Sequence, residues 1–240
     1  MKKLSPLTAV TSLLICAASG WVQAASLTVT VINLTHGTYL SPVLVAAHLK
    51  GDGSFPGPGA TASPSIRKLA ESGDVTDFQT DILNDNPSAV TQILNGSAHT
   101  KVAPGESVST VISTGSNDRL TVVAKLLPTN DGFTALNSID IPTNSGVYYY
   151  GLNALDAGTE ANDELVVPNG DTVGVQGIGP DSDITTGING TNTVGPDTNT
   201  MVHVHRGVLG DNDPSGGRSD LDSTTQRWLN PVARVVIEVP

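Results

Sequence analysis

The stretch LTVTVINL, residues 27–34, decides the fold of this chain. Apolar Leu27, Val29 and Val31 alternate with two threonines, and a period of two predicts a strand with one buried and one exposed face. The stretch VARVVIEV, residues 232–239, repeats this alternation near the other end of the chain. The sequence therefore predicts that half-buried strands open and close the folded domain.

Apolar segments between these two stretches extend the β pattern. Strands are predicted at residues 42–48, 107–113, 120–127, 146–153, 172–177 and 201–208. The tyrosine run 148–150 lies on one of them, where alternation should bury one or two rings and expose the rest. The 25 glycines and 15 prolines indicate many turns, and no strand–helix alternation is present. We therefore expect an all-β, antiparallel Greek-key sandwich.

Residues 63–96 carry the helical signals. A Ser63-Pro64 start predicts a first helix that stops near Gly73, and residues 77–83 and 88–94 are predicted as two more short helices. We interpret the segment as a short helical insertion between strands.

The first 24 residues have the form of a secretory signal peptide. Lys2 and Lys3 precede a short apolar core, and Val22-Gln-Ala24 fits a cleavage site. Residues 25–240 would then be a single domain without cysteine, held by its core or by metal rather than by disulfides. We expect export to the bacterial periplasm or the medium, and no transmembrane segment.

Acidic residues dominate the charge of the chain. The net charge is −11, from 23 acidic against 12 basic residues. This balance argues against nucleic acid as a partner, because no basic face could neutralise phosphates.

Two acidic turns, PTNDGF at 128–133 and DAGTEANDE at 156–164, follow apolar strands. Their candidate metal ligands are Asn130, Asp131, Asp156, Glu160, Asp163 and Glu164. Clustered carboxylates repel one another unless a cation is present, and calcium takes six to eight oxygen ligands from such loops. The spacing alone fits a calcium site and solvated acidic turns equally well.

Both turns also resemble a known family. Together with VTVINLT at 29–35, LNSID at 136–140 and NPVARVVI at 230–237, they are similar to the N-terminal domain of spondins over roughly residues 26–239. The resemblance implies a sandwich like the calcium- and lipid-binding modules, with one calcium held between loops.

The resemblance also assigns roles to single residues. The metal-binding aspartates of the family correspond to Asp131 and Asp156, and Glu160 takes an acidic position of the second turn. The function implied is a non-enzymatic binding module of the envelope or medium, whose partner is a surface, a glycan or a protein. This chain lacks the cysteines and adhesion repeats of the animal proteins, so binding to animal receptors is not implied.

Two alternative functions stay open. His203 and His205 are two apart on a predicted strand and share a face, so a zinc or copper site could support a metal-dependent hydrolase or a redox protein. An inert structural protein of the envelope is the third possibility. No Gly-x-Ser-x-Gly elbow supports nucleophilic catalysis.

A further acidic loop at residues 210–222 invites comparison with calcium loops. It lacks the spacing of an EF-hand. The sequence allows either a second cation site or a flexible acidic loop.

Overall fold

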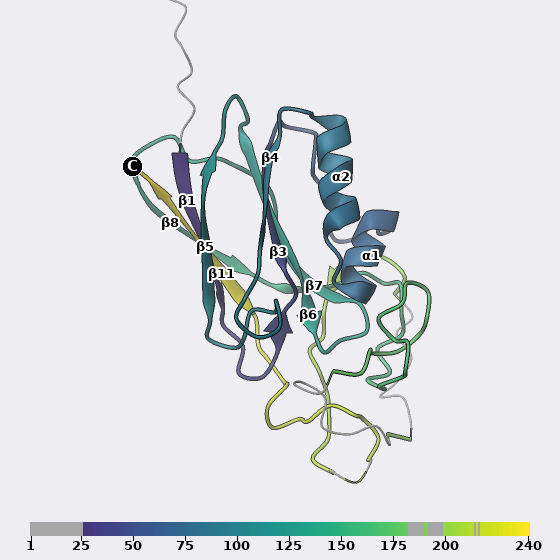
Figure 1. The fold of residues 1–240 in the computed structure, drawn as a ribbon. Helices are drawn as coiled ribbons and strands as arrows, with labels where there is room; N and C mark the ends of the chain where they lie inside the picture. Colours follow the sequence, from purple (N-terminus) through teal and green to yellow (C-terminus); the bar gives the residue numbers. More distant parts are fainter. Residues whose placement is uncertain (1–25, 182–189, 192–198, 214, 216) are drawn as a thin grey trace, which may run out of the picture.

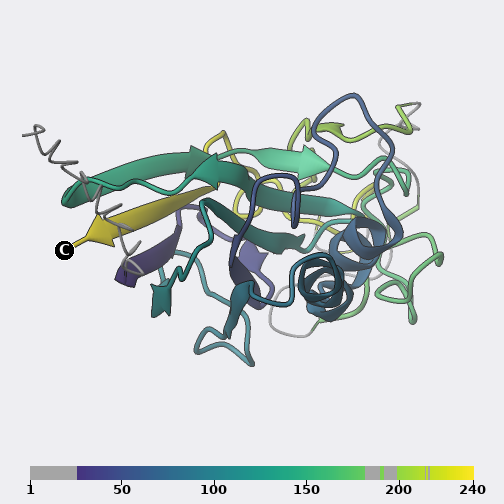
Figure 2. The ribbon, with the colours of Figure 1, turned by 90° about the horizontal axis from the view of Figure 1, so that it is seen from above.

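A computed structural model describes residues 26–181, 190–191, 199–213, 215 and 217–240. The predicted signal peptide, residues 1–24, lies outside these ranges and stays a prediction. The described part has three layers (Figures 1 and 2): a four-stranded sheet, a seven-stranded sheet and a pair of helices.

The two sheets account for most of the regular structure. The first has the order β5 (Ser107–Ser113), β1 (Ser26–Asn33), β11 (Ala233–Val239) and β8 (Gly146–Leu152). The second has the order β10 (His203–Val204), β9 (Ala154–Asp156), β7 (Gly132–Asp140), β6 (Arg119–Leu127), β3 (Val43–His48) and β4 (Val90–Leu94), and β2 (Tyr39–Leu40) pairs with β6. Every pairing between these strands is antiparallel, which confirms the predicted all-β sandwich.

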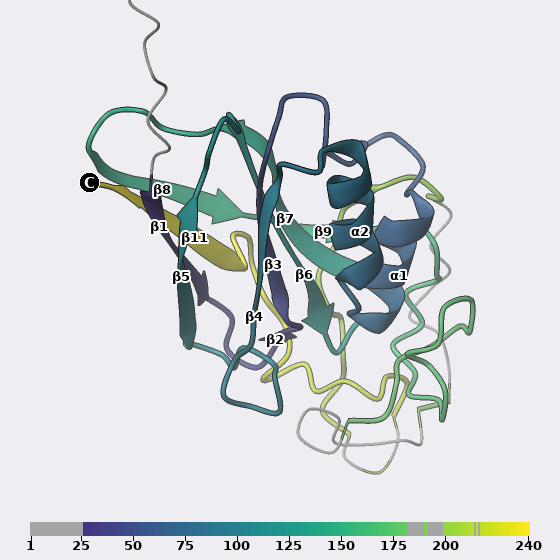
Figure 3. The same ribbon diagram turned by 45° about the horizontal axis from the view of Figure 1, so that its top comes forward.

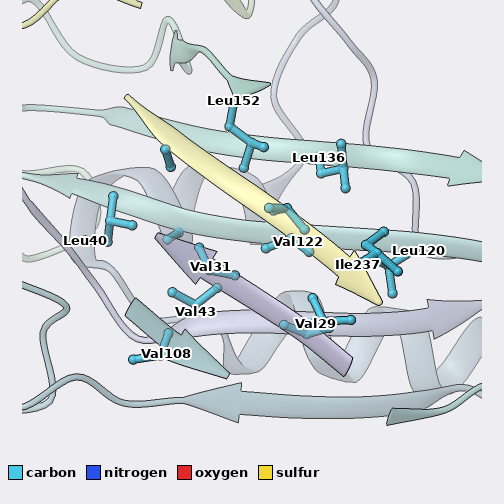
Figure 4. Packing of buried hydrophobic residues seen from close by; sticks show 14 of the residues in the cluster. Val29, Val31, Leu40, Val43, Val108, Leu120, Val122, Leu136, Leu152 and Ile237 are labelled. Atoms are coloured by element: carbon cyan, nitrogen blue, oxygen red, sulfur yellow. The ribbon is translucent and has the colours of Figure 1, made fainter. Parts of the chain in front are cut away.

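The first and last strands pair with each other at the centre of the first sheet. Val29 faces Ile237 across the pair, and the alternation of both strands turns their apolar side chains toward the second sheet. Figure 4 shows these side chains meeting Leu120 and Val122 of β6. Burying each such side chain contributes about 1.5–3 kcal/mol, so the apolar side chains between the two sheets stabilise the sandwich.

The helices α1 (Pro64–Ser72) and α2 (Thr76–Asp85) cover the outer face of the second sheet (Figure 3). Ser63 caps α1 by accepting a hydrogen bond from the Ile66 N–H, and Gly73 ends the helix with a φ of 77°. Both ends of α1 are therefore as predicted.

Three sequence predictions are wrong. Residues 88–94, predicted as a helix, contain β4, because Val90 and the residues after it pair with β3. Residues 172–177 form turns instead of a strand, with Val173 and Val175 on the surface. Of residues 201–208, only 203 and 204 are a strand. Strand β7 was not among the predicted strands.

The tyrosine prediction is confirmed. Tyr148 and Tyr150 pack against the core between the sheets, whereas Tyr149 is 67% exposed.

The described parts of the long connections after β9 lie at one end of the sandwich, below β6 and β7 in Figure 1. This end holds both acidic turns.

Candidate functional site

Asp131 joins the two acidic turns. It stands just before β7 and is fully buried. Its Oδ2 accepts hydrogen bonds from the Thr159 N–H at 2.7 Å and the Glu160 N–H at 3.0 Å. Its backbone carbonyl accepts one from the Ala157 N–H at 3.2 Å. The structure therefore brings together the two turns that the sequence predicted to meet.

Asp156 lies at the end of β9 and is also fully buried. Its Oδ1 accepts a hydrogen bond from the Gly158 N–H at 2.8 Å, and its Oδ2 accepts one from the Asn162 amide at 2.6 Å. Burial, followed by the nearby charge of Asp131, raises the pKa of Asp156 to about 6. The expected turn at Asp156 is present, but its carboxylate is buried rather than solvated.

Gly158 makes this turn feasible. Its φ is +69°, and a Cβ there would lie 2.6 Å from the backbone of Thr200. Only glycine fits this position without displacing the chain.

Glu160 completes the group and is 8% exposed. Its Oε2 accepts hydrogen bonds from the Gly177 N–H at 3.1 Å and the Asn130 amide at 3.4 Å. Burial raises the pKa of Glu160 to about 8, and burial also raises the pKa of Asp131. We call Asp131, Asp156 and Glu160 the buried acidic cluster.

Two oxygens of the buried acidic cluster stand out. Asp131 Oδ1 and Glu160 Oε1 are buried and have no hydrogen-bond partner in the part of the chain that the structure describes. A buried carboxylate oxygen without a partner is costly, and such atoms call for an explanation.

The other candidate ligands of the second turn hold loops together. Asp163 accepts hydrogen bonds from the Asn130 and Gln176 amides. Glu164 accepts them from the Leu209 and Gly210 N–H groups, at 2.7 and 2.8 Å. That a metal ion binds to Asn130, Asp163 or Glu164 stays a prediction.

Lys125 is the residue of this region that the sequence reasoning missed. It belongs to β6 and is 1% exposed. Its ammonium donates hydrogen bonds to the carbonyls of Ala70, Thr129 and Asn130. Burial lowers the pKa of Lys125 to about 8, against the charges of the surrounding carboxylates. A charged residue inside the mostly apolar stretch 120–127 was the available signal.

Hard oxygen donors without partners suit calcium, so the two free carboxylate oxygens fit this ion. Within the described ranges, however, no group of three His, Cys, Asp or Glu side chains could hold a metal ion. A calcium site here would therefore need backbone or amide oxygens beside the carboxylates.

A family model described as Spondin_N matches residues 33–186, and this segment contains both acidic turns. The chain belongs to the spondin N-terminal domain family. Membership places this spondin domain among extracellular domains that are generally non-enzymatic. Strand β11 lies outside the matched segment, and a comparison with curated proteins gives no match. Among the described residues, no helix is long and apolar enough to span a membrane.

The two histidines of the alternative hypothesis lie beside the buried acidic cluster of the spondin domain. His203 pairs with Asp156 in the β10–β9 ladder, and its Nδ1 donates to the Met201 carbonyl at 2.8 Å. The Nδ1 of His205 accepts from the Gly207 N–H, and the ring packs on Trp228 with a centroid distance of 5.2 Å. Both imidazoles therefore take part in local structure.

The acidic loop of the spondin domain, residues 210–222, is built differently. The Asp211 carboxylate accepts hydrogen bonds from the N–H groups of Asp213, Arg218 and Ser219. These bonds, the one from Ser219 first, lower the pKa of Asp211. Hydrogen bonds from the hydroxyl and the N–H of Ser215 lower the pKa of Asp213 in the same way. The carboxylates of Asp211 and Asp213 are therefore satisfied by groups of the loop itself.

Proposed function

We propose that this spondin domain is an exported, non-enzymatic calcium-binding module. One observation carries the proposal: Asp131 Oδ1 and Glu160 Oε1 are buried without a hydrogen-bond partner among the described residues. A calcium ion supplies the positive charge and the vacant coordination positions that such oxygens need.

The existing hydrogen bonds of Asp131 and Glu160 indicate which segments a bound calcium ion would fix in place. Asp131 already holds the backbone of residues 159 and 160 through its other oxygen. Glu160 likewise holds the Gly177 N–H. A cation between these carboxylates would hold the 156–164 turn to the loop that contains Gly177. The result is a fixed loop end that can recognise a surface, a glycan or a protein.

Export rests on the signal-like N-terminus and on the extracellular character of the family. A protein that works outside the cytoplasm meets far more free calcium, and weak sites of extracellular modules are filled there.

Thermal unfolding in calcium and in EDTA tests the proposal. At a calcium concentration about 100 times Kd, mass action adds about 2.7 kcal/mol to the free energy of unfolding, which raises Tm by roughly 5–10 °C for a chain of this size. We expect this rise in the wild type and not in Asp131→Asn. An equal Tm with and without calcium would overturn the proposal.

The same experiment tests the histidine alternative. Zinc or copper that binds the wild type but not His203→Ala would favour a metal-dependent hydrolase or redox protein instead. His48→Ala is an unsuitable control, because His48 is buried and bonded to Thr121. His36→Ala serves better, because His36 is exposed.

A further inference from the structure

Lys125 occupies a position where strand alternation would place an apolar side chain. Leu120, Val122 and Leu126 of β6 face the core between the sheets, whereas Val123 faces the helices. Lys125 lies two positions after Val123 and shares its face. A charged side chain is therefore built into the layer between the second sheet and the helices.

The ammonium of Lys125 is fully used by backbone oxygens. Its three N–H groups correspond to three acceptors, the carbonyls of Ala70, Thr129 and Asn130, with distances of 2.9 Å to Thr129 and 2.8 Å to Asn130. Rings of carbonyl oxygens like this one are also how proteins bind free cations. The ammonium is thus held as a free cation would be, but it is covalently attached to the chain.

One of these carbonyls belongs to the end of α1. Ala70 lies in the last turn of the helix, where carbonyls lack helical partners and carry the negative end of the helix dipole. Helix α1 has no basic residue of its own in that turn. Lys125 supplies the missing positive charge from β6.

Carboxylates act on the ammonium through space, and none in the part of the chain that the structure describes forms a close ion pair with it. Four acidic residues stabilise its charge, in the order Asp171, Asp131, Glu160 and Glu71. Asp131 and Glu160 are also the two residues with a buried oxygen that lacks a partner among the described residues. The positive charge of Lys125 therefore acts on the same oxygens that would hold calcium.

We propose that Lys125 is a tethered cation that balances the buried acidic cluster in the metal-free protein and, for that reason, weakens calcium binding there. This inference rests on the calcium site of the proposed function. Two positive charges near one pair of carboxylates repel each other, and this repulsion is stronger in a partly buried site than in water. Lys125 is thus a positioning residue that sets calcium affinity.

The test compares Lys125→Met with the wild type. Methionine keeps the length and the apolar stem of lysine and removes the charge. We expect the variant to have a lower Tm in EDTA and a calcium Kd at least about tenfold lower. Calcium should therefore raise its Tm more than it raises that of the wild type.

Lys68→Met is the matched control. Lys68 lies on α1 and forms ion pairs with Asp74 at 2.9 Å and Asp77 at 2.8 Å, all on the surface. The same chemical change at this position should leave the calcium Kd unchanged. A similar gain in affinity in both variants would show only the effect of net charge and would overturn the proposal.

The outcomes separate this inference from the proposed function. Wild type that binds calcium, with Lys125→Met binding equally or more weakly, overturns the inference alone. Calcium binding by Lys125→Met but not by the wild type supports the inference and removes the proposed function. If neither protein binds calcium, both are wrong.

A second variant covers a folding failure of Lys125→Met. The double variant Lys125→Met/Glu160→Gln removes the lysine together with a carboxylate that its charge stabilises, and it is compared with Lys125→Met at about pH 9, above the raised pKa of Glu160, where that carboxylate is ionised. If Lys125 acts by balancing charge, the double variant should fold in EDTA with a higher Tm than Lys125→Met. A double variant that does not fold, in EDTA or in calcium, overturns the proposal.

Discussion

The buried acidic cluster and the acidic loop at 210–222 are both rich in carboxylates, but the pKa values of these groups are shifted in opposite directions. In both regions aspartates accept hydrogen bonds from backbone N–H groups, as Asp131 and Asp211 do. Desolvation nevertheless raises the pKa of Asp131, whereas hydrogen bonds from backbone N–H groups lower the pKa of the half-buried Asp211. The two regions differ in burial and in carboxylate oxygens that lack partners among the described residues, so we expect a cation in the buried acidic cluster and none in the acidic loop.

The largest expected effect comes from the centre of the buried acidic cluster. Asp131→Ala leaves the Thr159 and Glu160 N–H groups without their acceptor and removes a predicted calcium ligand. In saturating calcium we expect a loss of about 3 kcal/mol or more in the free energy of unfolding, measured by denaturant titration. Asp211→Ala, the same change in the acidic loop, should have a much smaller effect. Equal losses would remove the distinction between the two regions.

The pH dependence of stability should separate the regions next. In the unfolded chain, Asp156 and Glu160 lose their protons near their ordinary pKa values of 3.8 and 4.5. In the folded protein they keep them up to about 6 and about 8, so the folded state binds more protons across this window. Stability therefore falls as pH rises from about 4 to about 8, by several kcal/mol.

Thermal scans in EDTA at steps across that window measure the slope. Asp156→Asn should make it shallower, and saturating calcium should oppose it because calcium favours the ionised carboxylates. The acidic loop contributes in the opposite direction, since lowered aspartate pKa values give stability that is lost only as pH falls below about 4. A wild-type Tm in EDTA that rises steadily from pH 5 to pH 8 would contradict the cluster's raised pKa values.

Glu164 should show an intermediate effect. Glu164→Gln weakens the bonds from the Leu209 and Gly210 N–H groups that hold the acidic loop to the second turn. We expect a loss of about 1–2 kcal/mol in stability and an unchanged calcium Kd, measured by calorimetry. Loss of calcium binding would instead make Glu164 a ligand, as the sequence first suggested.

The smallest effect is expected at the tip of the acidic loop. Asp213 is exposed and bonds mainly to Ser215. Asp213→Ala should change neither Tm nor the number of calcium ions bound. A drop in calcium stoichiometry would reveal a second cation site in this loop.

Much of the fold was predictable because its main strands carry a strict period of two. β1, β5 and β11 bury alternate residues against one core, so local pattern and tertiary contact agree. β4 was misread because Val90–Leu94 is short and its conformation is set by pairing with β3. The turns at 172–177 were misread because Val173 and Val175 are apolar yet exposed.

The site was predictable in part. Turn composition and order along the chain identified Asp131 and Asp156, and the structure brings their turns together. Lys125 escaped because its role depends on helix α1, whose packing over β6 places Ala70 beside the ammonium. The contacts of Glu164 escaped because they join segments 45 and 55 residues apart in the chain.

The most direct test of the central claim is the calcium stoichiometry of the domain at neutral pH, measured by isothermal titration calorimetry on the wild type and Asp131→Asn. If calcium binds at the buried acidic cluster, the titration gives one ion per chain for the wild type and none for the variant. No binding by the wild type, or equal binding by both proteins, would contradict the claim.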